Sequence, residues 1–117
     1  MSAVNEYLLG HRKEYEPYWI APRIICKDGF SMSVQVHQGV YCSPRDGFGP
    51  VWAMAEIGFP SAKPSAEVMA YIDSPKDDPT DTVYRYVPME LIDRLVAEHG
   101  GIDIQAIVAA NAKGGAS

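Results

Sequence analysis

The chain has 117 residues, of which 47% are hydrophobic and 21% charged, and its formal net charge is −5. This length and composition predict a single globular domain over residues 1–117, with a hydrophobic core of its own. The negative charge argues against nonspecific binding to nucleic acid or to an anionic membrane, because both need a basic patch on the protein. No apolar run approaches the roughly 20 residues that cross a bilayer, and no secretion signal is seen, so we expect a cytoplasmic protein.

The N-terminal segment is expected to be a mobile, polar lead-in over residues 1–16. Within it, Val4, Leu8 and Leu9 would share one face of a short helix that ends at Gly10. A helix this short is marginal without packing, so we assign no core role to it.

A β-hairpin is predicted next. A first strand region at residues 19–26 leads through a turn at Asp28 and Gly29, a pair that tolerates the positive φ of tight turns. Residues 30–37 then alternate between apolar and polar side chains. The apolar positions are Phe30, Met32, Val34 and Val36. This period of two predicts a half-buried strand.

The middle of the chain alternates loops with a third strand. Two prolines and two glycines mark residues 41–50 as a loop. Residues 51–59 predict a strand with two rather apolar faces, and therefore a central strand covered on both sides. Residues 65–72 fit a helix or a strand equally well, and the proline-rich acidic segment 73–80 predicts an exposed loop.

The C-terminal part gives the clearest prediction. A β-type run at residues 82–87 precedes Pro88, which suits the first position of a helix. The helix has an apolar stripe formed by Leu91, Ile92, Leu95 and Val96. Gly100 and Gly101 would cap it, Asp103 would start a second short helix, and residues 112–117 would be a mobile tail. The expected fold class is therefore α+β, with a mostly antiparallel sheet of 3–5 strands and one main C-terminal helix packed on it.

Motifs for catalysis are missing from the sequence. We find no phosphate-binding loop, no Gly-x-Ser-x-Gly and no His-Glu-x-x-His, and we therefore expect no catalytic site, no metal and no cofactor. Cys26 and Cys42 are expected to be thiols that behave as small hydrophobic residues. A rival interpretation pairs Cys42 with His37 as a thiol nucleophile, and it predicts a fast-reacting Cys42.

Two loops are the candidate partner-binding sites. The first contains Tyr41, Arg45 and Phe48, because tyrosine and arginine are favoured anchors at interfaces and ordered loops often carry function. The second is the acidic loop with Asp73, Asp77 and Asp78. Its spacing fails the helix–loop–helix calcium motif, so the choice lies between a solvated acidic loop and a docking loop.

Two tyrosines in the predicted strand at residues 82–87 receive a structural interpretation. Tyr84 and Tyr86 are expected to share one strand face and pack under the helix, with Arg85 on the other face.

Several segments together resemble a family of small proteins encoded by phages and prophages. The resemblance covers roughly residues 19–102. It rests on Asp28-Gly29-Phe30-x-Met32-Ser33-Val34-Gln35, Tyr41-Cys42-Ser43-Pro44-Arg45, Glu56-x-Gly58-Phe59-Pro60-Ser61, Pro79-Thr80-Asp81-Thr82-Val83-Tyr84-x-Tyr86-Val87-Pro88 and His99-Gly100-Gly101-Ile102. It carries over no functional residue. It implies an accessory protein in the cytoplasm of a bacterial host.

Two main hypotheses follow for the function. The first is stoichiometric binding to a host protein or defence complex, in an anti-CRISPR-like role, without enzymatic activity. The alternative is an oligomer that binds and sequesters a small molecule such as a nucleotide, with aromatic residues near Arg45 stacking on the base. A sheet edge left open in so short a chain would also permit a homodimer.

Overall fold

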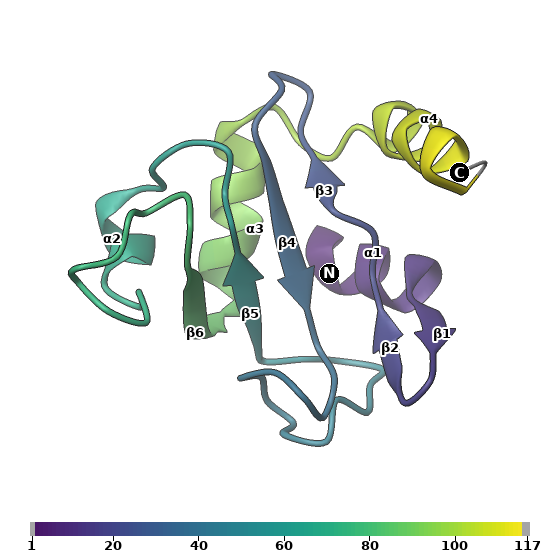
Figure 1. The fold of residues 1–117 in the computed structure, drawn as a ribbon, viewed down its shortest axis with the longest axis horizontal. Helices are drawn as coiled ribbons and strands as arrows, with labels where there is room; N and C mark the ends of the chain where they lie inside the picture. The colour runs from purple at the N-terminus through teal and green to yellow at the C-terminus, as the bar shows by residue number, and fades with distance from the viewer. Residues whose placement is uncertain (1, 116–117) are drawn as a thin grey trace.

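The computed structural model describes residues 2–115 and confirms the α+β class (Figure 1). Its helices and strands follow one another in chain order as α1 (Ala3–His11), β1 (Lys13–Tyr15), β2 (Tyr18–Ile20), β3 (Ile24–Ile25), β4 (Ser31–Gln35), β5 (Met54–Gly58), α2 (Ala66–Met69), β6 (Val83–Pro88), α3 (Met89–Glu98) and α4 (Ile104–Gly115). Four strands form an antiparallel sheet in the order β3-β4-β5-β6, while β1 and β2 form a separate hairpin. Among these residues no helix has both the length and the apolar character needed to span a membrane.

The core lies between one face of the sheet and the helices α1 and α3. Met32 and Val34 of β4 and Ile57 of β5 are fully buried, as the alternation in the sequence predicts. The predicted stripe of α3 places Ile92, Leu95 and Val96 in the same buried cluster. Figure 1 shows α3 running behind the strands, so one face of the sheet stays open on the viewer's side.

The N-terminal segment is not a lead-in to the core but a part of it. Val4 and Leu8 of α1 are fully buried, whereas Leu9 is exposed, and the helix continues past Gly10 to His11. The side chain of Ser2 caps the helix by accepting the N–H of Asn5 at 3.0 Å. The segment therefore gains stability from packing, which a prediction based on helix length leaves out.

The two predicted N-terminal strands differ in outcome. The second is confirmed as β4, and the turn before it places Gly29 at a φ of +96°. The first region is divided, because β2 pairs with β1 while only β3 joins the main sheet. The side chain of Gln35 connects the two parts by hydrogen bonds to the backbone N–H and C=O of Ala21, at 2.9 and 2.8 Å.

The third strand is central, but its two faces are covered unequally, since Glu56 on the second face is only half-buried. β5 lies between β4 and β6, with Ala55 and Ile57 buried, while Met54 on the other face is exposed. The predicted alternation fails before Met54, where Trp52 is fully buried and Val51 is exposed. Burial still alternates at residues 51–53, but in the phase opposite to the prediction, and the phase changes at Met54, where the irregular chain joins β5.

The C-terminal predictions are largely confirmed. Residues 65–72 contain the short helix α2. Pro88, predicted at the first helical position, is instead the last residue of β6 and the N-cap of α3. Gly100 and Gly101 have φ values of +90° and +92°, the left-handed conformation of a helix C-terminus. Asp103 accepts the N–H of Ala106 at 3.0 Å and so caps α4. The predicted tail from residue 112 is instead helical as far as Gly115, and residues 116–117 lie outside the described part.

Both edges of the four-stranded sheet are partly covered by the chain itself. At β6, Asp73 donates its N–H to Val83 and Arg85 donates to Tyr71, each at 3.0 Å. At β3, Asp103 donates its N–H to Ile25 at 2.8 Å. Pairing with a second copy through either edge would compete with these bonds, and homodimerisation stays a prediction.

Candidate functional site

A β-bulge in β6 builds the most distinctive part of the surface. Ala55 pairs with Val87 and Ile57 pairs with Tyr84, so Arg85 and Tyr86 together oppose the single residue Glu56. The predicted common face for Tyr84 and Tyr86 is therefore wrong. Tyr84 is fully buried and Tyr86 is 39% exposed.

Tyr86 reaches the surface through an unusual backbone conformation. Its φ is +51°, in the left-handed region that residues other than glycine rarely adopt. Its N–H donates to the carbonyl oxygen of Tyr41 at 3.2 Å, and the two rings lie 5.6 Å apart with a tilt of 56°. Tyr41 is 37% exposed, so both rings are available at the surface and hold each other in place.

Two arginines complete the arrangement. The guanidinium carbons of Arg45 and Arg85 lie 5.6 Å and 5.1 Å from the centre of the Tyr41 ring, within the range of cation–π attraction. Arg45 also donates to the carbonyl oxygens of Gln38 and Val40, at 3.1 and 2.5 Å. We call Tyr41, Arg45, Arg85 and Tyr86 the tyrosine–arginine surface.

Two carboxylates, those of Asp73 and Glu56, bond to residues of this surface. Asp73 forms an ion pair with Arg85, with 2.9 Å between Oδ1 and Nε. Glu56 accepts the N–H of Tyr41 at 3.2 Å. Burial raises the pKa of Glu56 above its ordinary value, and the hydrogen bond from Tyr41 works in the opposite direction. The side chains of the surface are thus held by bonds that exist before any partner arrives.

The structure joins only some of the predicted site residues. Tyr41 and Arg45 belong to the tyrosine–arginine surface, and Asp73 contacts it through Arg85. Phe48 is exposed but lines a separate cavity.

The remaining acidic residues of the predicted site stabilise their own loop. Asp77 accepts the hydroxyl of Thr82 at 2.8 Å. Asp78 accepts the N–H and hydroxyl of Thr80, and these bonds lower the pKa of Asp78. These hydrogen bonds within the loop account for the presence of both carboxylates, because they stabilise its conformation.

Arg85 and Tyr86 are the functional candidates that the sequence did not indicate as such. The strand pattern places them on alternate faces, and no local signal in the sequence marks the bulge that changes this. The conformation of Tyr86 is the feature that identifies them, and it is visible only in three dimensions.

The thiol-nucleophile interpretation gains no support from the geometry. Both cysteines are free and buried. The thiol of Cys42 contacts the backbone carbonyl oxygens of His37 and Pro44, at 3.5 and 3.3 Å. Burial raises the pKa of Cys42, which disfavours the thiolate that a nucleophile needs.

Neither a metal-binding cluster nor a similar known protein helps to assign the site in the described part of the chain. Within residues 2–115 no group of three or more histidine, cysteine, aspartate or glutamate side chains could hold a metal ion. Searches of protein-family models, of the curated proteins and of the solved structures found no match for this chain. Functional inference therefore rests on the contacts of the tyrosine–arginine surface itself.

Proposed function

We propose that this protein acts by stoichiometric binding to another protein through the tyrosine–arginine surface. The observation that carries the proposal is the bulge in β6, which turns Tyr86 outward against Tyr41 at the expense of a strained backbone. Strained residues persist where the surrounding structure enforces them, and they gather at binding and active sites.

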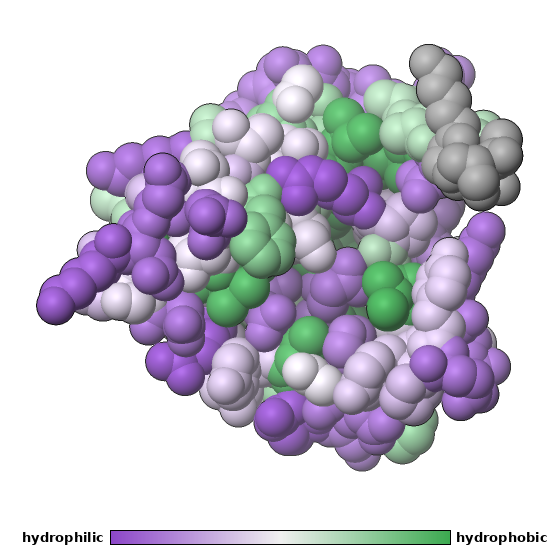
Figure 2. Space-filling model, viewed as in Figure 1, coloured by the Kyte–Doolittle hydropathy of each residue, from purple (hydrophilic) through white to green (hydrophobic). Residues whose placement is uncertain are grey.

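The composition of the surface supports a protein as the partner. Tyrosine and arginine are enriched among the residues that contribute most to protein–protein binding, because they offer a large rigid area together with hydrogen bonds. Here both kinds of side chain are already ordered, so less conformational entropy is lost on binding. Figure 2 shows small hydrophobic patches separated by polar residues on the face that it draws, and directed contacts by a few anchors fit such a surface better than a broad apolar interface does.

The class of partner is proposed from the resemblance to small phage and prophage proteins. A host protein is the expected target, and a component of a bacterial defence complex, inhibited in an anti-CRISPR-like manner, is the sharpest form of the proposal. A protein that acts by occupying a surface needs one copy for each target and no chemistry of its own.

Affinity capture from bacterial lysate, followed by reconstitution with the purified partner, tests the proposal. The bait is the full chain as wild type, as Tyr86→Ala and as Tyr15→Ala. Tyr15 is an exposed tyrosine of the β1–β2 hairpin, at the other side of the molecule in Figure 1, and serves as the matched control. We expect a partner that binds wild type and Tyr15→Ala one to one and binds Tyr86→Ala at least tenfold more weakly.

Two outcomes would contradict the proposal. One is that wild type retains no protein in stoichiometric amount from lysates with or without defence operons. The other is that a retained partner binds Tyr86→Ala as tightly as wild type, which would place the interface elsewhere.

A further inference from the structure

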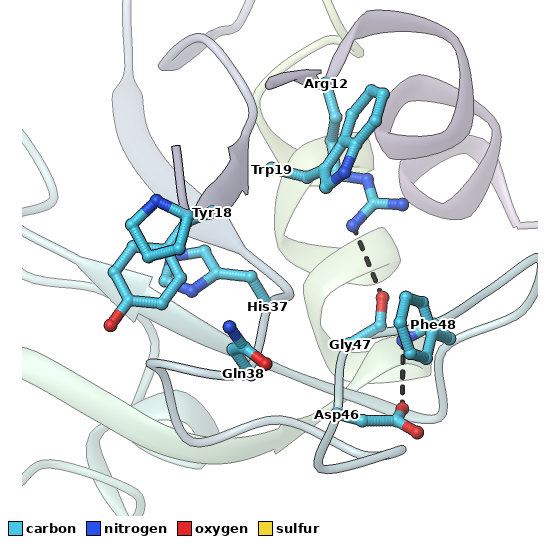
Figure 3. Close-up of a pocket in the computed structure, with 9 residues that line it drawn as sticks. Arg12, Tyr18, Trp19, His37, Gln38, Asp46, Gly47 and Phe48 are labelled. Carbon is cyan, nitrogen blue, oxygen red and sulfur yellow. Dashed lines mark hydrogen bonds between the residues drawn. The ribbon is translucent and has the colours of Figure 1, made fainter. Parts of the chain in front are cut away.

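The cavity next to Phe48 shares no lining residue with the tyrosine–arginine surface. It has a volume of about 400 Å³, within the range typical of small-molecule sites. It lies between the end of α1, the β1–β2 hairpin and residues 37–48 (Figure 3). Its lining residues are Arg12, Pro17, Tyr18, Trp19, His37, Gln38, Asp46, Gly47 and Phe48.

Arg12 provides a fixed positive charge in this cavity. Its guanidinium carbon lies 4.5 Å from the ring centre of Trp52 and 5.9 Å from that of Trp19. Nη1 donates to the carbonyl oxygens of Val36 and Gly47, at 2.9 and 3.3 Å, the second of which is drawn in Figure 3. The guanidinium is therefore held in one place before any ligand binds.

The charge of Arg12 is incompletely compensated. Its Nε is buried without a hydrogen-bond partner, and no carboxylate in the described part of the chain forms an ion pair with it. Burial lowers the pKa of Arg12, because the charged form loses part of its solvation. A desolvated cation without a counter-ion favours the binding of an anion.

Aromatic rings border the same cavity and remain at the surface. Phe48 is 71% exposed and Trp19 is 45% exposed, so packing in the core does not explain why aromatic residues stand at these positions. Tyr18 stacks on His37 at 4.6 Å across the cavity from Arg12. Exposed flat rings beside a fixed cation suit a ligand that is itself planar at one end and anionic at the other.

Two further polar groups narrow the class of ligand. The carboxylate of Asp46 accepts the N–H of Phe48 at 3.0 Å and can accept hydroxyl groups as well. Nδ1 of His37 accepts the N–H of Gly39 at 3.1 Å, which leaves the proton of the neutral ring on Nε2. Burial and the charge of Arg12 lower the pKa of His37, so at neutral pH the ring is a neutral hydrogen-bond donor.

We infer that this cavity binds a nucleoside monophosphate. The base would stack on Trp19 and Phe48, the phosphate would pair with Arg12, and the ribose hydroxyls would donate to Asp46. A single arginine beside a carboxylate suits one phosphate better than a chain of phosphates, because Asp46 repels additional negative charge.

Fluorescence titration of the full chain tests the inference. The probes are the four ribonucleoside monophosphates, the nucleoside matching the tightest of them, inorganic phosphate and benzoate. We expect saturable quenching of the tryptophan fluorescence at one site by at least one monophosphate, with binding of the nucleoside, phosphate and benzoate at least tenfold weaker. Phe48→Ala should weaken binding of the monophosphate and of the nucleoside by about tenfold each, since one stacking surface is lost.

Further variants distinguish the effect of losing the Arg12 charge from the effect of unfolding the protein. Arg12→Gln should make the monophosphate bind no better than its nucleoside, and its melting temperature shows whether it folds. If that variant fails to fold, the exposed Phe48 still decides the outcome. Phe59→Ala, which removes an exposed aromatic ring outside the cavity, and Tyr86→Ala should bind the ligand as wild type does.

Several results would overturn the inference. The first three are no saturable quenching by any monophosphate at millimolar concentration, equal affinity for the monophosphate and its nucleoside, and unchanged affinity in Phe48→Ala. Equal binding of benzoate or phosphate alone would likewise overturn the assignment to a nucleotide.

Discussion

Tyr86 connects local strain with the surface that we propose to be functional. A left-handed conformation costs an L-residue roughly 1–2 kcal/mol, and glycine would avoid this cost. The strained residue has its ring outside the core, beside Tyr41. The bulge thus leaves the Tyr86 ring at the surface, while it brings both Tyr84 and Val87 into the core.

Replacing Tyr86 by glycine and by alanine separates the ring from the backbone. Both variants lose the ring, but only alanine keeps a Cβ at a φ of +51°. We expect Tyr86→Gly to have a free energy of unfolding about 1 kcal/mol higher than Tyr86→Ala, measured by urea denaturation. Equal stabilities would show that the backbone at the bulge relaxes.

Asn5 attaches α1 to the chain before β5 by two hydrogen bonds. Its side chain accepts the N–H of Trp52 at 2.7 Å and donates to the carbonyl oxygen of Trp52 at 3.1 Å, both inside the core. Asn5→Ala would leave two buried backbone groups unpaired, and we expect a loss of about 2 kcal/mol in chemical denaturation. Asn111→Ala, at an exposed position of α4, should change stability by less than about 0.5 kcal/mol. A loss of similar size in both variants would contradict this role.

At the scale of elements, replacing each of two glycines by alanine should change the melting temperature in opposite directions. Gly101 ends α3 with a φ of +92°, so a Cβ there is strained although space is open around it. Gly10 lies within α1 with no atom near the position of a Cβ. We expect Gly101→Ala to lower the melting temperature and Gly10→Ala to raise it, each by an amount corresponding to about 1 kcal/mol. Shifts of the same sign would refute the cap at Gly101.

The sequence predicts elements well where local pattern and tertiary packing agree. The alternation at Phe30–Val36 and the stripe of α3 are two such cases, and their apolar side chains are buried as predicted, except that Leu91 is only partly buried. The role of α1 could not be predicted, because its stability comes from contacts with Trp52 and Asp93 that are distant in sequence. The burial of Trp52 could not be predicted either, because the chain before β5 is irregular.

The candidate site was predictable only in part. Residue type and loop position indicate Tyr41 and Arg45, since both properties are local. The contribution of Tyr86 depends on the bulge, and that of Arg12 on two tryptophans from different segments. No short-range pattern encodes either arrangement.

At the scale of the whole molecule, α1 joins α3 to the chain that leads into β3. The N–H of Val4 at the start of α1 donates to Asp93 of α3 at 2.9 Å. The hydroxyl of Tyr7 donates to the carbonyl oxygen of Pro22 at 2.9 Å. Unfolding α1 would therefore expose both the helix and the sheet, and we expect one cooperative transition.

Alkaline pH should destabilise the whole fold through buried groups that are neutral in the native state. Burial raises the pKa of Tyr7 from 10.0 to about 12 and that of Cys26 from 9.0 to about 11. The unfolded chain loses these protons first, so the stabilisation is complete below about pH 9 and is lost as pH rises toward 12. Tyr7→Phe should show a flatter decline of unfolding free energy between pH 10 and 12 than wild type. Equal slopes would contradict this assignment.

Calorimetric titration of the purified partner against wild type, Tyr86→Gly and Tyr86→Ala tests the central claim most directly. We predict one partner per chain for wild type and an affinity at least tenfold lower for both variants, although their stabilities differ. The loss would then follow the missing ring and not the fold. Binding of Tyr86→Gly with the affinity of wild type would contradict the claim that the tyrosine–arginine surface is the interface.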